Sequence, residues 1–429
     1  MSGGANVAVG SPRRLARLIS DFAERPIMAS IRGGVAAVVP LTIVGGLFML
    51  LANPPLPALE RLLAPWADLL RIPVTATFGI LGLFVCLAVA HELGGRRGQD
   101  PLSSTILAGA SFLLLAVDPQ SGRLAPEPLG SQGILMAILV GVVAVEVQAL
   151  LARRGLVIRM PEGVPRMIYE SFAALVPLAV LVTGFWCLRF VLGVDLAGVI
   201  ERVFRPLVFA LDTLPGIATF AFLVTLLWSV GINGDNALDP IVGPFFLQYL
   251  AANVEAWERG APLPHPTALG FFTTFVNVGG TGATLALALV LLNSRNPVHR
   301  RVSRLSLPAQ VFQINEPLFF GLPIVLNPIL MVPYVINAVL LAGATFLLME
   351  WGLVGRPVVG IPWTTPPIVG HYLATGGDWR AAVWGGASIL LAMMVYWPFA
   401  RIWERQATGP GGSGGPSRTS HALQPPSPS

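Results

Sequence analysis

The stretch Val35-Ala-Ala-Val-Val-Pro-Leu-Thr-Ile-Val-Gly-Gly-Leu-Phe-Met-Leu-Leu-Ala52 decides the fold class of this protein. It carries no charged side chain, and it is long enough to cross about 30 Å of hydrocarbon, which takes roughly 17 to 25 helical residues. Asn53-Pro54-Pro55 follows in place of a small-residue cleavage site, so we expect a retained first span rather than a signal peptide.

Comparable apolar runs recur to about residue 400 and leave no polar interval large enough for a soluble domain. Of 429 residues, 54% are hydrophobic and 11% are charged, whereas a soluble domain carries about 25% charged residues. The mean hydropathy is +0.71. This composition predicts an all-α polytopic membrane protein.

Runs of spanning length begin near Gly34, Thr75, Leu102, Gly130 and Ser171 and predict five spans in the first half. Several apolar stretches of the second half are too short to span, which predicts re-entrant or broken helices there. A total of about ten spans, with both termini in the cytoplasm, agrees with the positive-inside rule. The arginines that set this orientation are Arg13, Arg14, Arg17, Arg25, Arg96, Arg97, Arg153, Arg154, Arg159, Arg166, those of Arg295–Arg304, Arg401 and Arg405.

The pattern divides the chain into five segments. We expect a cytoplasmic N-terminal segment (1–30), a five-helix domain (31–195), an interfacial linker helix (196–215), a second domain (216–405) and a disordered tail (406–429). The linker is expected because Val194 to Leu214 mixes charged and apolar residues at helical spacing. The tail is rich in Gly, Pro and Ser and lacks apolar periodicity.

Several classes of site lack support in the sequence. Cys86 and Cys187 lie inside apolar runs, so a disulfide, a redox pair and a zinc site are not indicated, and we expect no metal or cofactor. The net charge of +5 comes mainly from interhelical arginines, which report orientation rather than nucleic-acid binding.

Four polar segments rich in helix breakers interrupt the second half. Irregular backbone at membrane depth is tolerated only where protein buries it or where it lines a watery cavity, so these segments indicate a transport site. They are 228–236 (Trp-Ser-Val-Gly-Ile-Asn-Gly-Asp-Asn), 273–282 (Thr-Thr-Phe-Val-Asn-Val-Gly-Gly-Thr-Gly), 313–317 (Gln-Ile-Asn-Glu-Pro) and 362–367 (Pro-Trp-Thr-Thr-Pro-Pro).

The chemistry of these segments favours a sugar. Glu316 lies in an apolar run, where a carboxylate costs about 2.5–3.5 kcal/mol, so we expect a partner or a ligand for it. A carboxylate accepts from two hydroxyls, amides both donate and accept, and an indole faces the C–H side of a pyranose. The candidate substrate-binding residues are Asn233, Asp235, Asn236, Thr274, Asn277, Asn315, Glu316 and Trp363, with Glu316 also the candidate catalytic residue.

Each candidate has a structural alternative. Glu316 could form a salt bridge or cap a helix, Asn233-Gly-Asp235-Asn236 could be a turn that satisfies its own backbone, and Trp363 could be an interfacial anchor. The glycines 279, 280 and 282 lack the spacing and the lysine of a phosphate-binding loop, so we expect close packing or an open backbone. His91, His265, His299 and His421 favour solvated or structural roles, while His371 stays a candidate for chemistry.

The segment Ile314-Asn-Glu-Pro-Leu-Phe-Phe-Gly-Leu-Pro-Ile-Val-Leu-Asn-Pro328 closely resembles the membrane IIC component of the bacterial phosphotransferase system, in its lactose/cellobiose (diacetylchitobiose) family. The likeness covers about residues 15–405. Its other motifs are Pro40–Gly45, Met160–Pro165, Phe275–Thr284, Pro362–Pro367 and Gly376–Arg380.

The resemblance implies a homodimer in the cell membrane with ten spans, in which the first five make the dimer contact. It also implies that the second half carries the sugar between two re-entrant hairpins by an elevator-like movement. A phosphocysteine on a separate IIB protein, supplied by IIA, then phosphorylates the sugar 6-hydroxyl near Glu316, with Trp363 in the sugar site. Cargo of this family includes β-disaccharides such as cellobiose, lactose or chitobiose.

One position departs from the family pattern. The family commonly has Gly-Ile-His-Gly where this chain has Gly231-Ile-Asn-Gly234, and an amide does not titrate near neutral pH as an imidazole does. A IIC-like facilitator, symporter or sensor without phosphorylation is therefore the alternative function. An intramembrane enzyme using Glu316 with Asp235 is a third hypothesis, and it requires two carboxylates at a defined separation.

Overall fold

Helices make up the regular structure of this protein throughout the residues that the computed structural model describes, which are 21–54, 57–158, 172–322, 324 and 327–408. Within these residues the only extended pairing is an isolated bridge between Val117 and Leu124. The prediction of an all-α chain is confirmed for this part of it.

Long apolar helices dominate the first half. Asp100 shows how one begins, because its Oδ2 accepts a 2.8 Å hydrogen bond from the Ser103 N–H and Pro101 follows in the first turn. In chain order the elements are α2 (Pro26–Ala52), α3 (Pro57–Leu63), η1 (Ala64–Trp66), α4 (Ala67–Thr77), η2 (Phe78–Ile80), α5 (Leu81–Arg96), α6 (Pro101–Leu115), η3 (Glu127–Leu129), η4 (Ser131–Gly133), α7 (Ile134–Arg153), α9 (Leu175–Trp186) and η5 (Cys187–Val191).

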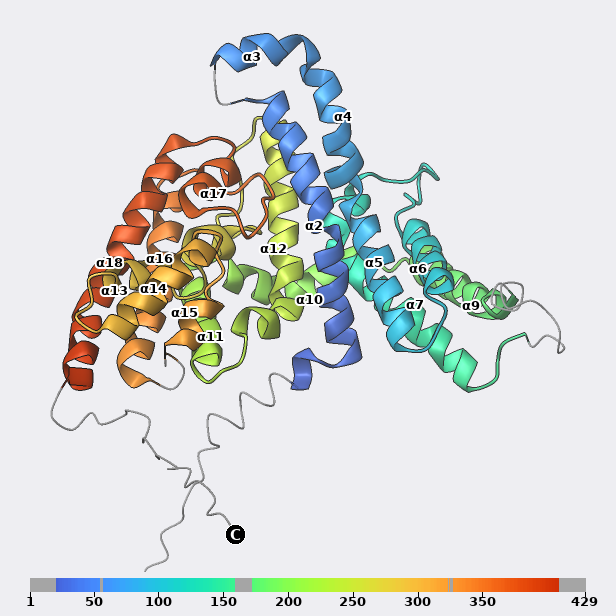
Figure 1. Ribbon diagram of the computed structural model, residues 1–429. Helices are drawn as coiled ribbons and strands as arrows, with labels where there is room; N and C mark the ends of the chain where they lie inside the picture. The colour runs from blue at the N-terminus through green and yellow to red at the C-terminus, as the bar shows by residue number, and fades with distance from the viewer. Residues whose placement is uncertain (1–20, 55–56, 159–171, 323, 325–326, 409–429) are drawn as a thin grey trace, which may run out of the picture.

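Helix α5 is the centre of this half, packed against α2, α6 and α7. Small residues allow the close approach: a Cβ built on Gly34 would lie 2.5 Å from Val89 Cγ2, and one on Gly94 would lie 2.5 Å from Ser104 Oγ. Figure 1 shows these helices on the blue-to-green side of the molecule, with α6 and α9 at its edge.

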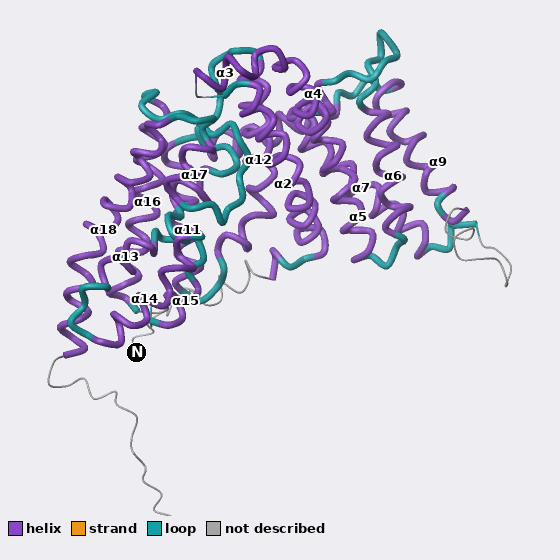
Figure 2. The backbone as a smooth tube through the Cα atoms, turned by 45° about the horizontal axis from the view of Figure 1, so that its top comes forward, coloured by secondary structure: helices purple, strands orange, loops and turns teal. Residues whose placement is uncertain are grey.

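Short helices and connecting loops alternate with longer helices in the second half. The elements are α10 (Leu196–Leu211), α11 (Leu214–Ser229), α12 (Gly234–Glu258), η6 (Phe271–Val276), α13 (Thr284–Leu291), α14 (Pro297–Val311), α15 (Glu316–Gly321), α16 (Pro328–Glu350), α17 (Pro367–Ala374) and α18 (Trp379–Thr408). Most of them gather on the other side of α2, whereas α10 packs against α7 and α11, and loops run between the helices of this half (Figures 1 and 2).

Five helices of the described residues are long and apolar enough to cross a membrane, or six if the bent pair Leu175–Val191 and Leu196–Phe204 is one span. Helices α6 and α11 are apolar but shorter. The structure therefore supports a polytopic membrane protein. The expected ten spans and re-entrant hairpins go beyond this finding and stay predictions.

The cysteines, the linker helix and the terminal segments were also the subject of predictions. Cys86 is buried, Cys187 is partly buried, and both are free thiols. Helix α10 lies where a linker helix is predicted, whereas its place at a membrane surface stays a prediction. Met160–Pro165, the arginines 13, 14, 17, 159 and 166, His421, and residues 409–429 of the tail lie outside the described residues.

Candidate functional site

Asp235, in the first turn of α12, is a hydrogen-bonding hub. Its Oδ2 accepts from Trp228 Nε1 and from Thr281 Oγ1, each at 2.8 Å, and its Oδ1 accepts from Asn277 Nδ2 at 3.3 Å. Trp228 belongs to α11, while Asn277 and Thr281 belong to the loop between η6 and α13. A carboxylate offers about four lone-pair sites, so three donors occupy most of its capacity. Asp235 therefore positions other polar groups.

Asn315 extends this cluster to a third polar segment. It is buried, and its Nδ2 donates to the Thr281 carbonyl at 3.3 Å. The segments 228–236, 273–282 and 313–317, which are far apart in the sequence, thus meet around Asp235 and Thr281. We call Trp228, Asp235, Asn277, Thr281 and Asn315 the inner polar cluster.

Gln313 holds the loop that carries the cluster. Its Oε1 accepts from the N–H groups of Gly279 at 2.7 Å and Gly280 at 3.3 Å, and its Nε2 donates to the Thr273 carbonyl at 3.0 Å. Gly279 and Gly280 lie in a loop and Thr273 lies in the π-helix η6, so a side chain supplies partners that an α-helix would otherwise provide.

The glycines of this loop are required by conformation and space. Gly280 has φ of 106°, and a Cβ on it would lie 2.4 Å from Asn315 Cβ. Gly282 has φ of 74°, and a Cβ on it would lie 2.2 Å from Tyr334 Cδ2. The expectation of close packing is confirmed, and the Gly279 and Gly280 amides are directed to Gln313 rather than left open for an anion.

Glu316 is exposed at the start of α15, directly after buried Asn315. In the described residues its carboxylate has no ion pair or hydrogen bond, so the salt-bridge alternative has no partner there. Phe319 of the same helix packs edge-on against Trp228, with ring centroids 5.3 Å apart. Helix α15 is thereby joined to the indole that donates to Asp235, while the Glu316 carboxylate stays accessible.

Asn233 and Asn236 lie apart from the inner polar cluster. Asn233 caps α12, its Oδ1 accepting from the Asn236 N–H at 2.9 Å, as the turn alternative describes. Both residues line a cavity of about 360 Å³ beside the start of α2. There Arg32 Nη1 donates to the Asn236 carbonyl at 3.0 Å and Nη2 lies 3.2 Å from Glu24 Oε1.

The fourth polar segment, 362–367, leads directly into α17. Trp363 is 57% exposed in a turn closed by Thr365, whose hydroxyl donates to the Pro362 carbonyl at 2.7 Å. Thr274 is buried on η6 and faces Gly370 of α17. Neither Trp363 nor Thr274 has a hydrogen bond to Asp235 among those found in the described residues.

Comparison with known proteins identifies the family. The model of the family described as "Phosphotransferase system, EIIC" matches residues 32–338. The lichenan permease IIC component of Bacillus subtilis (strain 168) is 33% identical over 406 residues, which is 88% of this chain and 89% of the relative. The cellobiose-specific EIIC component of Geobacillus stearothermophilus is 32% identical over 422 residues, covering 92% of this chain and 93% of the relative.

A solved structure agrees. The transporter ChbC, the IIC component from the N,N'-diacetylchitobiose-specific phosphotransferase system, superposes with a TM-score of 0.86 at 31% identity, over 92% of this chain and 97% of that one. The chain belongs to the phosphotransferase system EIIC family. The family predicted from Ile314–Pro328 and the other motifs is therefore confirmed.

The sequence does not single out three residues that form or hold the inner polar cluster: Trp228, Thr281 and Gln313. All three lie inside the polar segments, so the sequence predicts their region but not their contacts. The signal for Trp228 is an indole donor seven residues before a carboxylate in an apolar region. Gln313 gives no such signal, because its backbone φ of 68° and its hydrogen bonds appear only in the folded chain.

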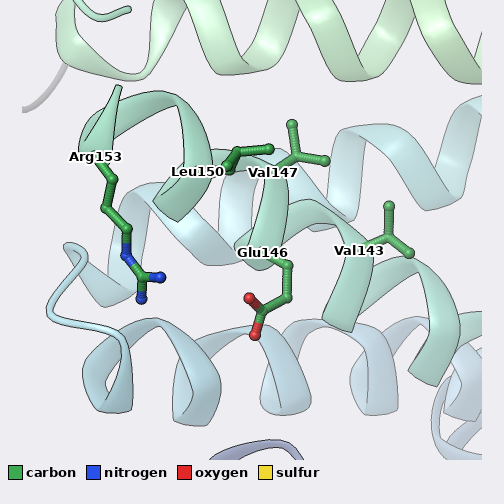
Figure 3. A pocket seen from close by; sticks show the side chains of 5 residues that line it. All are labelled: Val143, Glu146, Val147, Leu150 and Arg153. Carbon is green, nitrogen blue, oxygen red and sulfur yellow. The ribbon is translucent and has the colours of Figure 1, made fainter. Parts of the chain in front are cut away.

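Two other ionisable side chains, His371 and Glu146, have contacts within the protein. His371 is buried, with Nδ1 against the Pro367 carbonyl and its ring packed edge-on to Phe275 at 4.6 Å. Figure 3 shows a cavity of about 300 Å³ along α7, lined by Val143, Glu146, Val147, Leu150 and Arg153. Its carboxylate, Glu146, already accepts a 2.7 Å hydrogen bond from Arg97 Nε.

Proposed function

We propose that this EIIC protein is the sugar permease subunit of a phosphoenolpyruvate-dependent phosphotransferase system, with a β-linked disaccharide such as cellobiose, lactose or chitobiose as cargo. Family membership supports IIC sugar transport. The relatives named above act on lichenan, cellobiose and N,N'-diacetylchitobiose, as their names state. The observation that carries the proposal is the inner polar cluster, where three breaker-rich segments meet around Asp235.

The inner polar cluster fits an uncharged polyhydroxylated ligand. Asn277 and Asn315 supply amide groups, and Asp235 fixes the orientation of the Asn277 amide. Thr274 and Trp363 complete the site from the side of α17, with the indole facing the apolar side of a sugar ring. Asn233 and Asn236 belong to the cytoplasmic rim, where the cavity beside Arg32 lies.

Glu316 is the catalytic residue of this proposal. Its carboxylate accepts the proton of the sugar 6-hydroxyl while the hydroxyl oxygen attacks the phosphorus of the phosphocysteine on a separate IIB protein. The S–P bond breaks as the O–P bond forms, and the IIB thiolate leaves. IIA then restores phospho-IIB. The accessible position of Glu316, without an ion pair in the described residues, supports this role.

The architecture of the proposal is a homodimer that contacts through residues 31–195. The linker 196–215 lies in the interface, and residues 216–405 form the transport domain that moves the sugar. About ten spans, with re-entrant hairpins in the second half, place both termini in the cytoplasm. The short helices η6, α13, α15 and α17 and the loops beside them support such hairpins.

Reconstitution tests this function. Proteoliposomes that enclose IIA, IIB and phosphoenolpyruvate should accumulate sugar phosphate from external cellobiose. Because Gln cannot take the hydroxyl proton, Glu316→Gln should lower the phosphorylation rate by about 100-fold or more, with a much smaller change in sugar binding. Glu60→Gln, at an exposed position of α3, is the matched control and should leave both unchanged. Accumulation of free sugar would contradict phosphorylation.

Asn233 favours the alternative of a IIC-like facilitator, symporter or sensor not coupled to phosphorylation. Its Oδ1 is committed to the helix cap, and an amide cannot carry a proton near neutral pH. Under this alternative, Asn233→His leaves transport little changed. Under the leading proposal the new imidazole raises the phosphorylation rate, so the same reconstituted vesicles distinguish the two.

A further inference from the structure

A second polar cavity lies far from the inner polar cluster. It has a volume of about 840 Å³, within the range of about 300–1,000 Å³ that is usual for small-molecule sites. It lies between the start of α7, helix α10, the C-terminal half of α12 and the loop that follows α12. The polar side chains that line it include Gln132, Asp195, Asp212, Gln248, Tyr249 and His265.

The position of this cavity is at the other end of α12. Asp235 is in the first turn of that helix and Tyr249 is about 20 Å further along, at 1.5 Å rise per residue. The Asp235 end lies beside Arg32 of α2, which is the cytoplasmic end in the proposed orientation. The cavity is therefore on the outer side of the inner polar cluster.

The wall around His265 is fixed by hydrogen bonds. His265 Nδ1 lies 2.7 Å from Asp212 Oδ2, and the ring stacks on buried Tyr249 with centroids 4.3 Å apart. The His265 N–H donates to Asn253 Oδ1 at 2.9 Å, and Asn253 Nδ2 donates to the His265 carbonyl at 2.7 Å. With its proton on Nδ1, the ring offers Nε2 as an acceptor for a ligand hydroxyl.

Gln248 supplies the second observation. Its Oε1 atom is buried and has no hydrogen-bond partner, although the residue lines the cavity. A buried amide oxygen without a donor is unfavourable, so the Gln248 side chain gains a partner when it turns toward a ligand that brings hydroxyl groups into the cavity. Gln132, from the short helix η4, contributes a second amide to the lining.

The two carboxylates of the described lining are paired. Asp195 lies 3.4 Å from Arg189, and Asp212 lies 2.7 Å from His265. The described walls therefore offer hydrogen-bonding groups, which suit an uncharged sugar.

We propose that this cavity is an outer binding site for free oligosaccharide, occupied before the inner polar cluster. This rests on the proposed function, because the ligand class is that of the cargo. The site would hold free sugar on the entry side of the transport path.

Equilibrium binding of radiolabelled cellobiose, lactose and N,N'-diacetylchitobiose to the full-length protein in lipid nanodiscs tests the proposal. We expect two classes of sugar site in the wild type. Because it removes both amides, the double variant Gln132→Leu/Gln248→Leu should lose the outer class by at least about tenfold in affinity and keep the inner one.

The controls keep the result interpretable. Gln99→Leu changes an amide that lines a different cavity and should keep both classes. Gln248→Leu removes an unpaired amide oxygen, so its melting temperature without sugar should equal or exceed that of the wild type, which shows that it folds.

Two outcomes separate the two proposals. A single class of site that Asp235→Asn abolishes and the double variant retains would overturn the outer site and leave sugar transport standing. Failure of the wild type to bind any of the three sugars would contradict the proposed function and, with it, the outer site.

Discussion

Two buried glutamines show how differently the halves of this EIIC protein are built. Gln148 on α7 and Gln313 before α15 are each 6% exposed. Gln148 Oε1 accepts one hydrogen bond, at 2.7 Å from Ser104 Oγ, between two regular helices. Gln313 instead binds three backbone groups of chain that is no longer α-helical. The helices joined by Gln148 satisfy their own backbone, whereas Gln313 serves backbone groups that have no α-helical partner.

This difference follows from what each half has to do. A helix packed through small residues, such as α2 on α5 at Gly34, needs no polar side chain to stay in place. A loop that presents amides to a ligand must keep its backbone open, so other side chains have to hold it. The polar groups of the second half therefore include a supporting layer, Gln313 and Asp235, in addition to the amides that they hold in place.

Replacing each glutamine by leucine should give the largest difference in stability between the two halves. Gln313→Leu leaves the buried N–H groups of Gly279 and Gly280 and the partly buried Thr273 carbonyl unpaired. Each of the two buried groups costs about 1–3 kcal/mol, so we expect a loss of roughly 2–6 kcal/mol and no sugar binding. Gln148→Leu leaves only the Ser104 hydroxyl, which can rotate toward its own helix, and should cost about 1 kcal/mol. Thermal unfolding in detergent micelles and sugar binding measure both. Equal losses in the two variants would show that the halves are not held differently.

Replacing one glycine of each half by alanine should have a smaller effect on stability and a different effect on sugar binding in each half. Gly34→Ala overpacks α2 against Val89, which costs about 1–3 kcal/mol and should leave sugar binding unchanged once the protein is folded. Gly280→Ala adds the strain of a φ near 106°, about 1–3 kcal/mol more, and pushes on Asn315.

Sugar affinity, compared at a similar loss of melting temperature, separates Gly34→Ala from Gly280→Ala. Gly280→Ala should weaken binding by about tenfold or more, since Asn315 moves. If Gly34→Ala weakens binding as much at the same loss of stability, the loop has no special part in the site.

The helices of the first half were largely predictable from sequence because the hydrophobicity of the chain decides them. Apolar runs such as Val35–Ala52 give the helices, and the structure has α2 over Pro26–Ala52. The second half yielded its polar segments and Asp235 by the same reasoning, since charges are rare there and helix breakers mark the interruptions of the apolar runs. Which of them meet is set by tertiary contacts: Asp235 joins Trp228, Thr281 and Asn277, while its sequence neighbour Asn236 points to another cavity. Helical geometry separates adjacent residues by about 100°, so closeness in sequence does not predict a shared site.

The mildest test compares one loop carboxylate from each half. Burial raises the pKa of Asp378, but hydrogen bonds from the Arg380 side chain and from the Arg380 and Gly355 N–H groups outweigh it, and the pKa is lowered. In the first half, the hydroxyl of Ser121 and nearby backbone N–H groups lower the pKa of the loop residue Asp118. Both carboxylates contribute stability above their unfolded pKa, near 3.9, and lose it as the pH falls through the lower folded pKa.

Asp378→Asn should therefore destabilise the protein at pH 7, by about 1 kcal/mol, because the bonds from Arg380 and Gly355 weaken when the charge is removed. Asp118→Asn should change stability less, since solvent replaces its partners at no cost in burial. Melting temperatures from pH 7 to pH 3 measure both, and the Asp378 difference should shrink toward the acid end, where the wild-type carboxyl is protonated. A difference that stays constant over this range would mean that Asp378 acts through its shape rather than its charge, and the loop before α18 would then be held like the helices of the first half.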